Sequence, residues 1–395
     1  RRALMPIVVK DTCCRRYSCV AMVTASAEQH TTRPFAAGAF EFAIETADDD
    51  DRLRVESLFR DLPPASSADG DLTVFSFLRN DVDADSWTFG GPRVDHQPAL
   101  TLAASLDSIV TAVNLWALDA EPESLHLHAA AATREGRAVV IAAPRNTGKT
   151  TTVAHLVARG WGYVTDETLR LSAGDEKVRS FPKPLSIKPG GTKFVEHLQP
   201  WMMPALDDNT FRFVPIGASG ATVVDGGLPH LVVLLKRPSD TTSITAPVAR
   251  RLHPADAVVA LMQETLDAER FGSAALRLAK LATAAHCYEL TIGTPTATAE
   301  HIEELFELGP VDPVEVSVLP ASDAFSPGVV SVAVGDRAVV HDAGSGRILA
   351  LDDGGTRVWK GLGGWAGDDE IDVDGPVLRP FVAQLRALGV LADGR

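Results

Sequence analysis

Three consecutive residues, Gly148, Lys149 and Thr150, have the chemistry to hold the phosphates of a nucleotide. They lie near the end of the stretch "AVVIAAPRNTGKTTT", in which an apolar run leads through a polar turn into a helical pattern. A phosphate-binding loop needs a buried strand, a turn whose backbone N–H groups face the phosphates, and a helix that begins there. Its lysine reaches the terminal phosphates and the next hydroxyl binds Mg²⁺. The stretch therefore predicts a nucleotide site.

The loop departs from a glycine-rich pattern at its first position, where Ala143 precedes Pro144. Alanine adopts a positive φ only with strain, so this end of the loop must turn differently or carry strain. The alternative is that Gly-Lys-Thr occurs here by chance. The strand pattern before the loop and the helix pattern after it favour the nucleotide site. We expect the nucleotide to contact the loop residues Asn146, Thr147, Gly148, Lys149, Thr150 and Thr151.

Other polar residues stand near strand ends. Asp166 and Glu167 follow the apolar stretch "GYVT", and a carboxylate at the end of a neighbouring strand can hold Mg²⁺ or accept the proton of an attacking hydroxyl. The alternative is a pair of ordinary loop acids. His128 lies in the strand pattern before the loop, where a histidine is more often structural. His126 would point to the same face and competes for any role.

The elements that position these residues follow from apolar periodicity and turn residues. The pattern predicts a helix over 150–160 after the loop and a hairpin over 168–181 with Gly174 in its turn. The remaining strands are expected at 126–133, 137–143, 162–167 and 230–237, and the remaining helices at 254–266, 273–287 and 299–308. Cys287 falls inside the second of these helical patterns.

The chain divides into four parts by composition. Residues 1–29 are interpreted as a disordered or mis-assigned extension with Met22 as the start, 30–120 as a small α/β region, 121–309 as the loop-containing domain, and 314–395 as an α+β unit with short strands first. Within the second part we expect strands at 39–46 and 72–78, a solvated acidic loop at Asp48–Asp51, a short helix at 53–62 and a long buried helix at 100–120.

Composition excludes several classes of protein. A formal net charge of −15 spread along the chain argues against a general nucleic-acid binder, which needs a basic face. No apolar run is long and uninterrupted enough to predict a membrane span. Three of the four cysteines lie in the 1–29 extension and none forms a CxxC pair, so we expect a cytoplasmic protein without disulfides or zinc.

The combination "LHLHAAAA", "VVIAAPRNTGKTT" and "GYVTDE" resembles the catalytic domain of HPr serine kinase/phosphorylase and its kinase-like relatives, over about residues 125–308. The resemblance implies an α/β P-loop kinase core that uses ATP and Mg²⁺. It makes Asp166 the general base towards a Ser or Thr hydroxyl, with His128 positioning it. It also implies that Lys149 holds the β- and γ-phosphates, that Thr150 binds Mg²⁺, and that Glu167 assists the metal.

The chain departs from that family's pattern in the loop. Ala143, Arg145 and Asn146 stand where the family has Gly, Ser and Gly, which puts normal nucleotide affinity in question, and Glu167 replaces a second Asp. No capture loop for the protein HPr is evident, so HPr is not the expected substrate. The stretch "FPKPLSIKPGG" supplies Lys183 and Lys188, which would face phosphate or substrate, although two loop lysines are more often solvated.

Residues 314–395 resemble a PqqD-type peptide-recognition module, which has a winged-helix-like α+β fold. In that family a leader peptide adds as a strand to a sheet edge, and here "RAVVHDA" or its neighbour would be the edge. Trp359 is expected in the core and not as a contact. The residues that match the family pattern are Leu351, Gly355, Val358, Trp359, Leu362, Phe381, Leu385, Gly389 and Leu391.

Together the two resemblances imply an ATP-dependent Ser/Thr kinase of a ribosomally synthesised precursor peptide, whose leader is held by residues 314–395. One alternative, favoured by Ala143 and Pro144, is a degenerate P-loop scaffold that binds a leader for another enzyme. Another is a kinase of a small metabolite or a carrier protein. The kinase family's members are often homo-oligomers, and no residue pattern here decides the oligomeric state.

Overall fold

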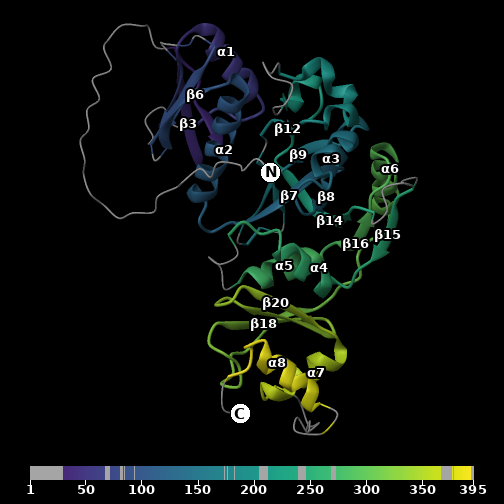
Figure 1. Ribbon diagram of the computed structural model, residues 1–395. Coiled ribbons are helices and arrows are strands. Elements are labelled where there is room, and N and C mark those ends of the chain that lie inside the picture. The colour runs from purple at the N-terminus through teal and green to yellow at the C-terminus, as the bar shows by residue number, and fades with distance from the viewer. Residues whose placement is uncertain are drawn as a thin grey trace, which may run out of the picture. The chain divides into compact units, whose positions relative to one another are not determined.

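The computed structural model forms two compact units, which are described separately (Figure 1). The first contains residues up to 121 together with 183–192 and 198–219, and the second contains the rest. The expected extension 1–29 lies outside the described residues. These are 30–66, 72–80, 83, 85–92, 94–172, 174, 175, 177–181, 183–203, 212–238, 246–267, 273–365, 376 and 378–392.

A six-stranded sheet with the order β1-β3-β4-β5-β6 organises the first unit, and β2 pairs with β3. The pair β3–β4 is parallel because α1 crosses between these strands, and the other pairs are antiparallel. The elements are β1 His30–Thr31, β2 Phe35–Ala37, β3 Phe40–Thr46, α1 Asp49–Leu58, β4 Thr73–Arg79, β5 Trp87–Gly91, β6 Val94–Leu100 and α2 Leu102–Ala120. This unit also holds the short pair β12 Leu185–Ile187 and β13 Arg212–Val214.

The prediction that Asp48–Asp51 forms a solvated loop is wrong. The Asp48 carboxylate caps α1 by accepting the N–H of Asp51, and the acidic residues that follow form the first helical turn, where negative charge is favoured by the helix dipole. Asp51 is fully buried and accepts from Arg79 Nε at 3.1 Å and Trp87 Nε1 at 3.2 Å. These partners stand far along the chain, so local composition does not reveal them.

Helix α2 confirms the long buried helix. Thr101 caps it by accepting the N–H of Ala104, and its buried residues include Leu106, Ile109 and Val113. By length and composition it is the one described helix that could cross a membrane, but half of its most apolar window is buried inside the protein. Such burial is typical of a core helix, as the sequence predicted.

The second unit is built on an eight-stranded sheet with the order β11-β10-β7-β8-β14-β16-β15, in which β9 also pairs with β7 (Figure 1). The strands β8, β14 and β16 are parallel, so their carboxyl ends meet at one edge. The bounds are β7 Leu125–Arg134, β8 Arg137–Ala142, β9 Gly162–Thr165, β10 Thr168–Leu171, β11 Val178–Arg179, β14 Gly226–Lys236, β15 Val248–Arg251 and β16 His286–Thr291.

Helices cover this sheet. The helices α4 and α5 share a hydrophobic core with Leu125, Leu127 and Val140, while α3 packs against α6 and β7. Because side chains alternate along a strand, His126 and His128 lie on the face opposite Leu125 and Leu127. The bounds are α3 Lys149–Ala158, α4 Pro254–Met262, α5 Ala274–Thr283 and α6 Pro295–Phe306.

Two of the predicted helices end earlier than the sequence indicates. Helix α4 ends at Met262, and the residues after it turn back along β7. Helix α5 ends at Thr283, so Cys287 lies in β16 and not in a helix. Burial raises the pKa of its thiol to about 12, which makes Cys287 a structural residue and not a nucleophile.

The last part of the chain is a four-stranded antiparallel sheet with the order β17-β18-β19-β20 and two helices. The strand "RAVVHD", β19, is interior; the edge strands of this sheet are β17 and β20, and of these β20 is a neighbour of β19. Trp359 is fully buried and stacks on Phe325 at 4.0 Å, as expected for a core residue. The bounds are β17 Val316–Leu319, β18 Val329–Val334, β19 Arg337–Asp342, β20 Arg347–Leu351, α7 Asp353–Leu362 and α8 Arg379–Ala387.

The two faces of this small sheet pack against different partners. Val332, Val334 and Val339 belong to the same hydrophobic core as α4 and α5. Ala338 and Val340 point the other way, into a core with α7 and α8. The ion pair between Arg337 and Asp256 at 2.9 Å adds a polar contact to α4. The C-terminal sheet is therefore joined to the larger sheet through α4 and α5.

Candidate phosphate-binding site

Strand β7 lies at the centre of the candidate site, between the strands that lead to the phosphate loop and to the acidic pair. Along one edge it pairs with β9 and then β10, and this ladder is interrupted at Asp166 and Glu167. Along its other edge it pairs with β8, whose last residue Ala142 lies opposite Ala129. Because β8 leaves the sheet there, the acidic pair and the start of the phosphate loop lie on either side of the same short part of β7.

The loop 143–148 runs from β8 to α3 and turns at Asn146, not at Ala143. Asn146 has a φ of 69° and Gly148 a φ of 115°, whereas Ala143 has no positive φ. Asparagine tolerates the left-handed region better than most residues, so the chain avoids strain at the position where the glycine is missing. Thr147 closes the turn, since its N–H and hydroxyl both donate to the Pro144 carbonyl.

Lys149 begins α3, and its side chain folds back across the loop. Its Nζ donates to the carbonyl oxygen of Ala143 at 2.5 Å, and the residue is buried. A buried ammonium needs anionic or carbonyl partners. This contact holds the ammonium against the start of the loop, and its predicted contact with phosphate stays a prediction.

Asp166 lies beside the first turn of α3. Its Oδ2 accepts from the Thr150 hydroxyl at 3.1 Å, its Oδ1 accepts from the Tyr163 hydroxyl at 3.3 Å, and the residue is buried. Glu167 is half-buried, and its N–H donates to the Thr165 hydroxyl at 3.4 Å. The structure thus brings the predicted base together with the predicted metal-binding hydroxyl, although their roles remain predictions.

Both histidines are paired with carboxylates. His126 is buried and its Nδ1 lies 2.8 Å from Asp267 Oδ2, whereas His128 is less buried, with Nδ1 3.3 Å from Glu264 Oε2. The predicted role of His128 in positioning Asp166 stays a prediction. His128 lies opposite Thr168 in the ladder.

The remaining predicted contacts divide between the two units. Thr151 is half-buried in the first turn of α3. Lys183 is buried, and its Nζ donates to Ser186 Oγ at 3.1 Å, while Lys188 is exposed. These two lysines belong to the first unit and are not part of the site described here, so their contact with phosphate stays a prediction.

Several polar neighbours were missed by the sequence reasoning. Arg237 follows β14 and donates to the Asn146 carbonyl, which places a cation beside the loop. Its position after the strand parallel to β8 was a usable signal, because ligands bind beyond the carboxyl ends of parallel strands. Tyr163, Glu264 and Asp267 carried no comparable signal.

The donor set suits Mg²⁺. Thr150, Asp166 and Glu167 offer hydroxyl and carboxylate oxygens, which this ion prefers. Among the described residues no group of three or more His, Cys, Asp or Glu side chains forms a cage for a metal. In proteins Mg²⁺ usually keeps several waters and is held by one or two carboxylates together with substrate phosphates.

Asn146 offers a test of the loop. Replacing Asn146 by valine is expected to weaken Mg·ATP binding about tenfold or more, because a β-branched residue at positive φ costs about 1 to 3 kcal/mol. Replacing it by glycine should leave the affinity within about threefold, because glycine adopts this φ freely. Isothermal titration calorimetry on both variants gives the comparison, and equal affinities would contradict this account of the turn.

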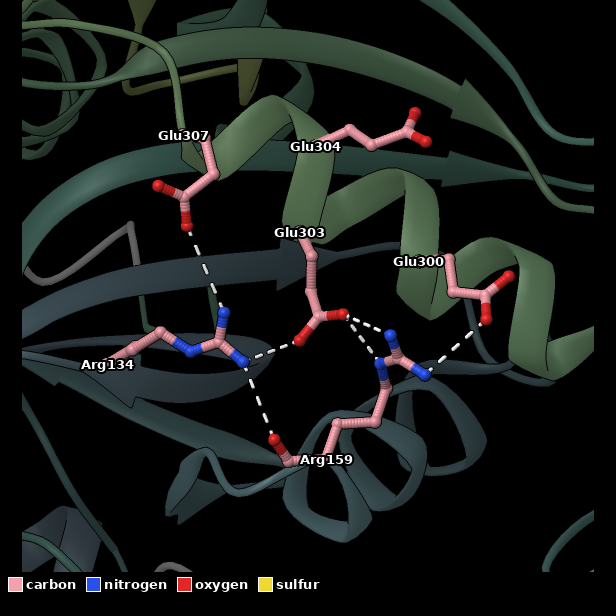
Figure 2. Close-up of a pocket in the computed structure, with 6 residues that line it drawn as sticks. All are labelled: Arg134, Arg159, Glu300, Glu303, Glu304 and Glu307. Carbon is pink, nitrogen blue, oxygen red and sulfur yellow. Dashed lines mark hydrogen bonds and ion pairs between the residues drawn. The ribbon is translucent and has the colours of Figure 1, made fainter.

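An open pocket of about 430 Å³ lies at the other end of β7. Figure 2 shows that Glu303 of α6 reaches between Arg134 and Arg159, while Glu304 points away from them. Glu303 Oε1 lies 2.5 Å from Arg134 Nη2, and Glu303 Oε2 lies 2.6 Å from Arg159 Nη2. Glu303 Oε1 also accepts from Trp161 Nε1 at 2.9 Å. The Glu303 carboxylate is therefore paired with both guanidinium groups. We call this cluster of Glu303, Arg134, Arg159 and Trp161 the clamp, because it links α6 to the end of α3.

The clamp predicts an acid-dependent contribution to stability. Burial raises the pKa of Glu303, but hydrogen bonds from Arg159, Trp161 and Arg134 outweigh it, and the net pKa lies below the usual 4.5. The contribution is therefore present above pH 4.5 and is lost as the pH falls through the lowered value. Glu303→Gln should cost about 1 to 2 kcal/mol at pH 7 and progressively less below pH 4.5, as measured by urea unfolding.

The control is Glu304→Gln, because Glu304 pairs with His301 on the surface. That variant should change the free energy of unfolding by less than about 0.5 kcal/mol. An equal loss in both variants, or a Glu303→Gln effect that does not change with pH, would rule out the clamp.

Comparison with known proteins gives structural similarity alone. No protein-family model matches the chain, and no curated protein matches it. Solved structures do match, among them the HPr(Ser) kinase/phosphatase from Coxiella burnetii, with 14% sequence identity and a TM-score of 0.25 over 46% of this chain and 96% of that chain.

Proposed function

We propose that this chain is an ATP-dependent phosphotransferase that phosphorylates a Ser or Thr hydroxyl. The observation that carries the proposal is the meeting of three groups at one end of β8. These are the turned loop 143–148, the buried Lys149 folded across it, and the hydrogen bond between Thr150 and Asp166. Phosphoryl transfer depends mainly on positioning and on neutralising charge, and these groups supply both.

In the proposed reaction the acceptor oxygen bonds to the γ-phosphorus while the bond from that phosphorus to the ADP oxygen breaks. Asp166 takes the hydroxyl proton, and Lys149 exchanges the Ala143 carbonyl for phosphate oxygens. Arg237 adds positive charge beside the loop. Mg²⁺, when bound, neutralises charge on the phosphates, and Thr150 with Glu167 would hold it.

We further propose that the acceptor is a ribosomally synthesised precursor peptide whose leader binds the C-terminal sheet. The supporting observation is that β20 stands at one end of the sheet, where, among the residues that the structure describes, β19 is its strand partner and its other edge has none. Its residues Ile348, Leu349 and Ala350 are half-buried. An extended peptide that adds to such an edge satisfies the backbone and packs alternate side chains. Holding the leader there would raise the local concentration of the acceptor.

The test is γ-phosphate transfer from ATP to a synthetic library of Ser- and Thr-containing peptides, read by mass spectrometry. Hydrogen exchange at β20 is measured alongside. We expect Mg²⁺-dependent phosphopeptides and slower exchange at 347–351 when a phosphorylated library member is present. Transfer to peptides without protection at β20 would contradict leader binding at this edge, and nucleotide binding without transfer to any peptide would favour a metabolite or carrier-protein acceptor. No nucleotide binding and no transfer would favour a leader-binding scaffold.

A further inference from the structure

The segment Glu264–Asp267 takes the place beside β7 that β8 leaves. The His128 N–H donates to the Glu264 carbonyl at 2.7 Å, and the Leu266 N–H donates to the His126 carbonyl at 2.9 Å. An antiparallel bridge between Leu127 and Thr265 lies between these bonds. The first residues of β7 are therefore held on both edges, by β10 and by this segment.

Each histidine of this part of β7 meets a carboxylate from the segment at Nδ1. Asp267 Oδ2 lies 2.8 Å from Nδ1 of the His126 ring, and Asp267 Oδ1 accepts the backbone N–H of His126 at 3.0 Å. Glu264 Oε2 lies 3.3 Å from Nδ1 of His128. An ionised carboxylate only accepts hydrogen bonds, so it favours the tautomer that carries the hydrogen on Nδ1.

That tautomer leaves Nε2 of each ring as a hydrogen-bond acceptor. In His126 this nitrogen is buried and has no partner among the described residues. The His128 side chain is 16% exposed, and it stands where the loop begins, one residue before the Ala129–Ala142 pair. Of the two rings, His128 is therefore the one that a bound ligand can meet.

We propose that Glu264 is a positioning residue of the site, which fixes the tautomer of His128 so that its Nε2 accepts from an N–H or O–H group of the bound substrate other than the hydroxyl whose proton Asp166 takes, and that Asp267 fixes the tautomer of the neighbouring His126 in the same way. The proposal rests on the phosphotransferase function proposed above for its catalytic consequence. The placement of the two carboxylates on one segment, opposite two histidines on the same face of β7, carries it.

The test is side-chain ¹⁵N NMR of the histidines in the full chain. We expect Nδ1–H to be the main neutral tautomer of both rings in the wild type. Asp267→Asn should convert His126 to the tautomer that carries its hydrogen on Nε2. The new amide oxygen can accept the backbone N–H of His126, while the amide NH₂ donates to Nδ1 of the ring. Glu264→Ala should lower the Nδ1–H fraction of His128.

A matched control is Glu304→Ala, which removes the carboxylate beside His301 on the surface, 2.9 Å from its Nδ1. It should leave His126 and His128 unchanged. An Nε2–H tautomer of His128 in the wild type, or the same His128 tautomer with and without Glu264, would overturn the proposal for Glu264. An unchanged His126 tautomer in Asp267→Asn would overturn it for Asp267.

Kinetics separates this proposal from the proposed function. Glu264→Ala should lower kcat roughly 10- to 100-fold, as is usual for residues that orient a ligating or reacting group, with the KM for Mg·ATP within about threefold. Wild-type rates in Glu264→Ala would count against the positioning role. A wild-type protein that transfers no phosphate would overturn the phosphotransferase function, and the tautomer measurement would still decide what Glu264 and Asp267 do.

Discussion

Replacing Asp166 by asparagine is expected to lower phosphoryl transfer by about 10²- to 10⁴-fold or more while Mg·ATP still binds. The amide cannot take the proton of the acceptor hydroxyl, whereas the loop and Lys149 are untouched. Asparagine also retains an oxygen that can accept from the Thr150 hydroxyl, which Asp166 Oδ2 accepts at 3.1 Å in the wild type. Single-turnover transfer and calorimetric binding, measured on the same preparation, test both halves of the prediction.

The matched control is Tyr163→Phe, which removes the 3.3 Å hydrogen bond to the other oxygen of Asp166 but leaves the carboxylate in place. Losing one such bond costs about 1 kcal/mol, so this variant should lose roughly tenfold or less in rate. If Asp166→Asn transferred phosphate at the wild-type rate, the assignment of Asp166 as the base would be wrong.

Replacing Val339 by aspartate should unfold the C-terminal sheet together with α4 and α5. Val339 is fully buried in the core that these elements share. An uncompensated buried charge costs about 3 to 5 kcal/mol, a large part of the 5 to 15 kcal/mol by which a typical domain is stable. Hydrogen exchange should show protection in α5 and α7 lost together.

Val318→Asp is the control for that experiment. Val318 belongs to β17, the strand at one end of the same sheet, and is 51% exposed, so the charge stays in water and stability should change by less than about 1 kcal/mol. If Val339→Asp removed protection from α7 while α5 kept its own, the C-terminal sheet would be an independently folding module and not part of a shared core.

Most elements around the site could be predicted from the sequence, because local patterns determine them. The apolar run of β8, the helical pattern of α3 and Gly160 after it identify strand, loop and helix. The acidic pair was correctly expected at a strand end, since "GYVT" is short and apolar. These signals depend on neighbouring residues and need no knowledge of the tertiary structure.

The features that were missed depend on distant residues. The segment after α4 continues the helical pattern in sequence, yet it pairs with β7 because β8 leaves an open edge there. Cys287 follows an alanine-rich run that suits a helix, but parallel pairing with β14 makes it part of a strand. The sequence indicated that Ala143 cannot easily form the turn that a glycine would form there. It did not indicate that Asn146 would take the positive φ instead.

The central claim is that the loop 143–148 binds nucleotide although its first glycine is missing. Its most direct test is isothermal titration calorimetry of Mg·ATP with the full-length wild type and with Lys149→Ala. We expect binding by the wild type and its loss in the variant, because the ammonium that would reach the phosphates is gone. Wild-type protein that binds no Mg·ATP, or a variant that binds as tightly as the wild type, would contradict it.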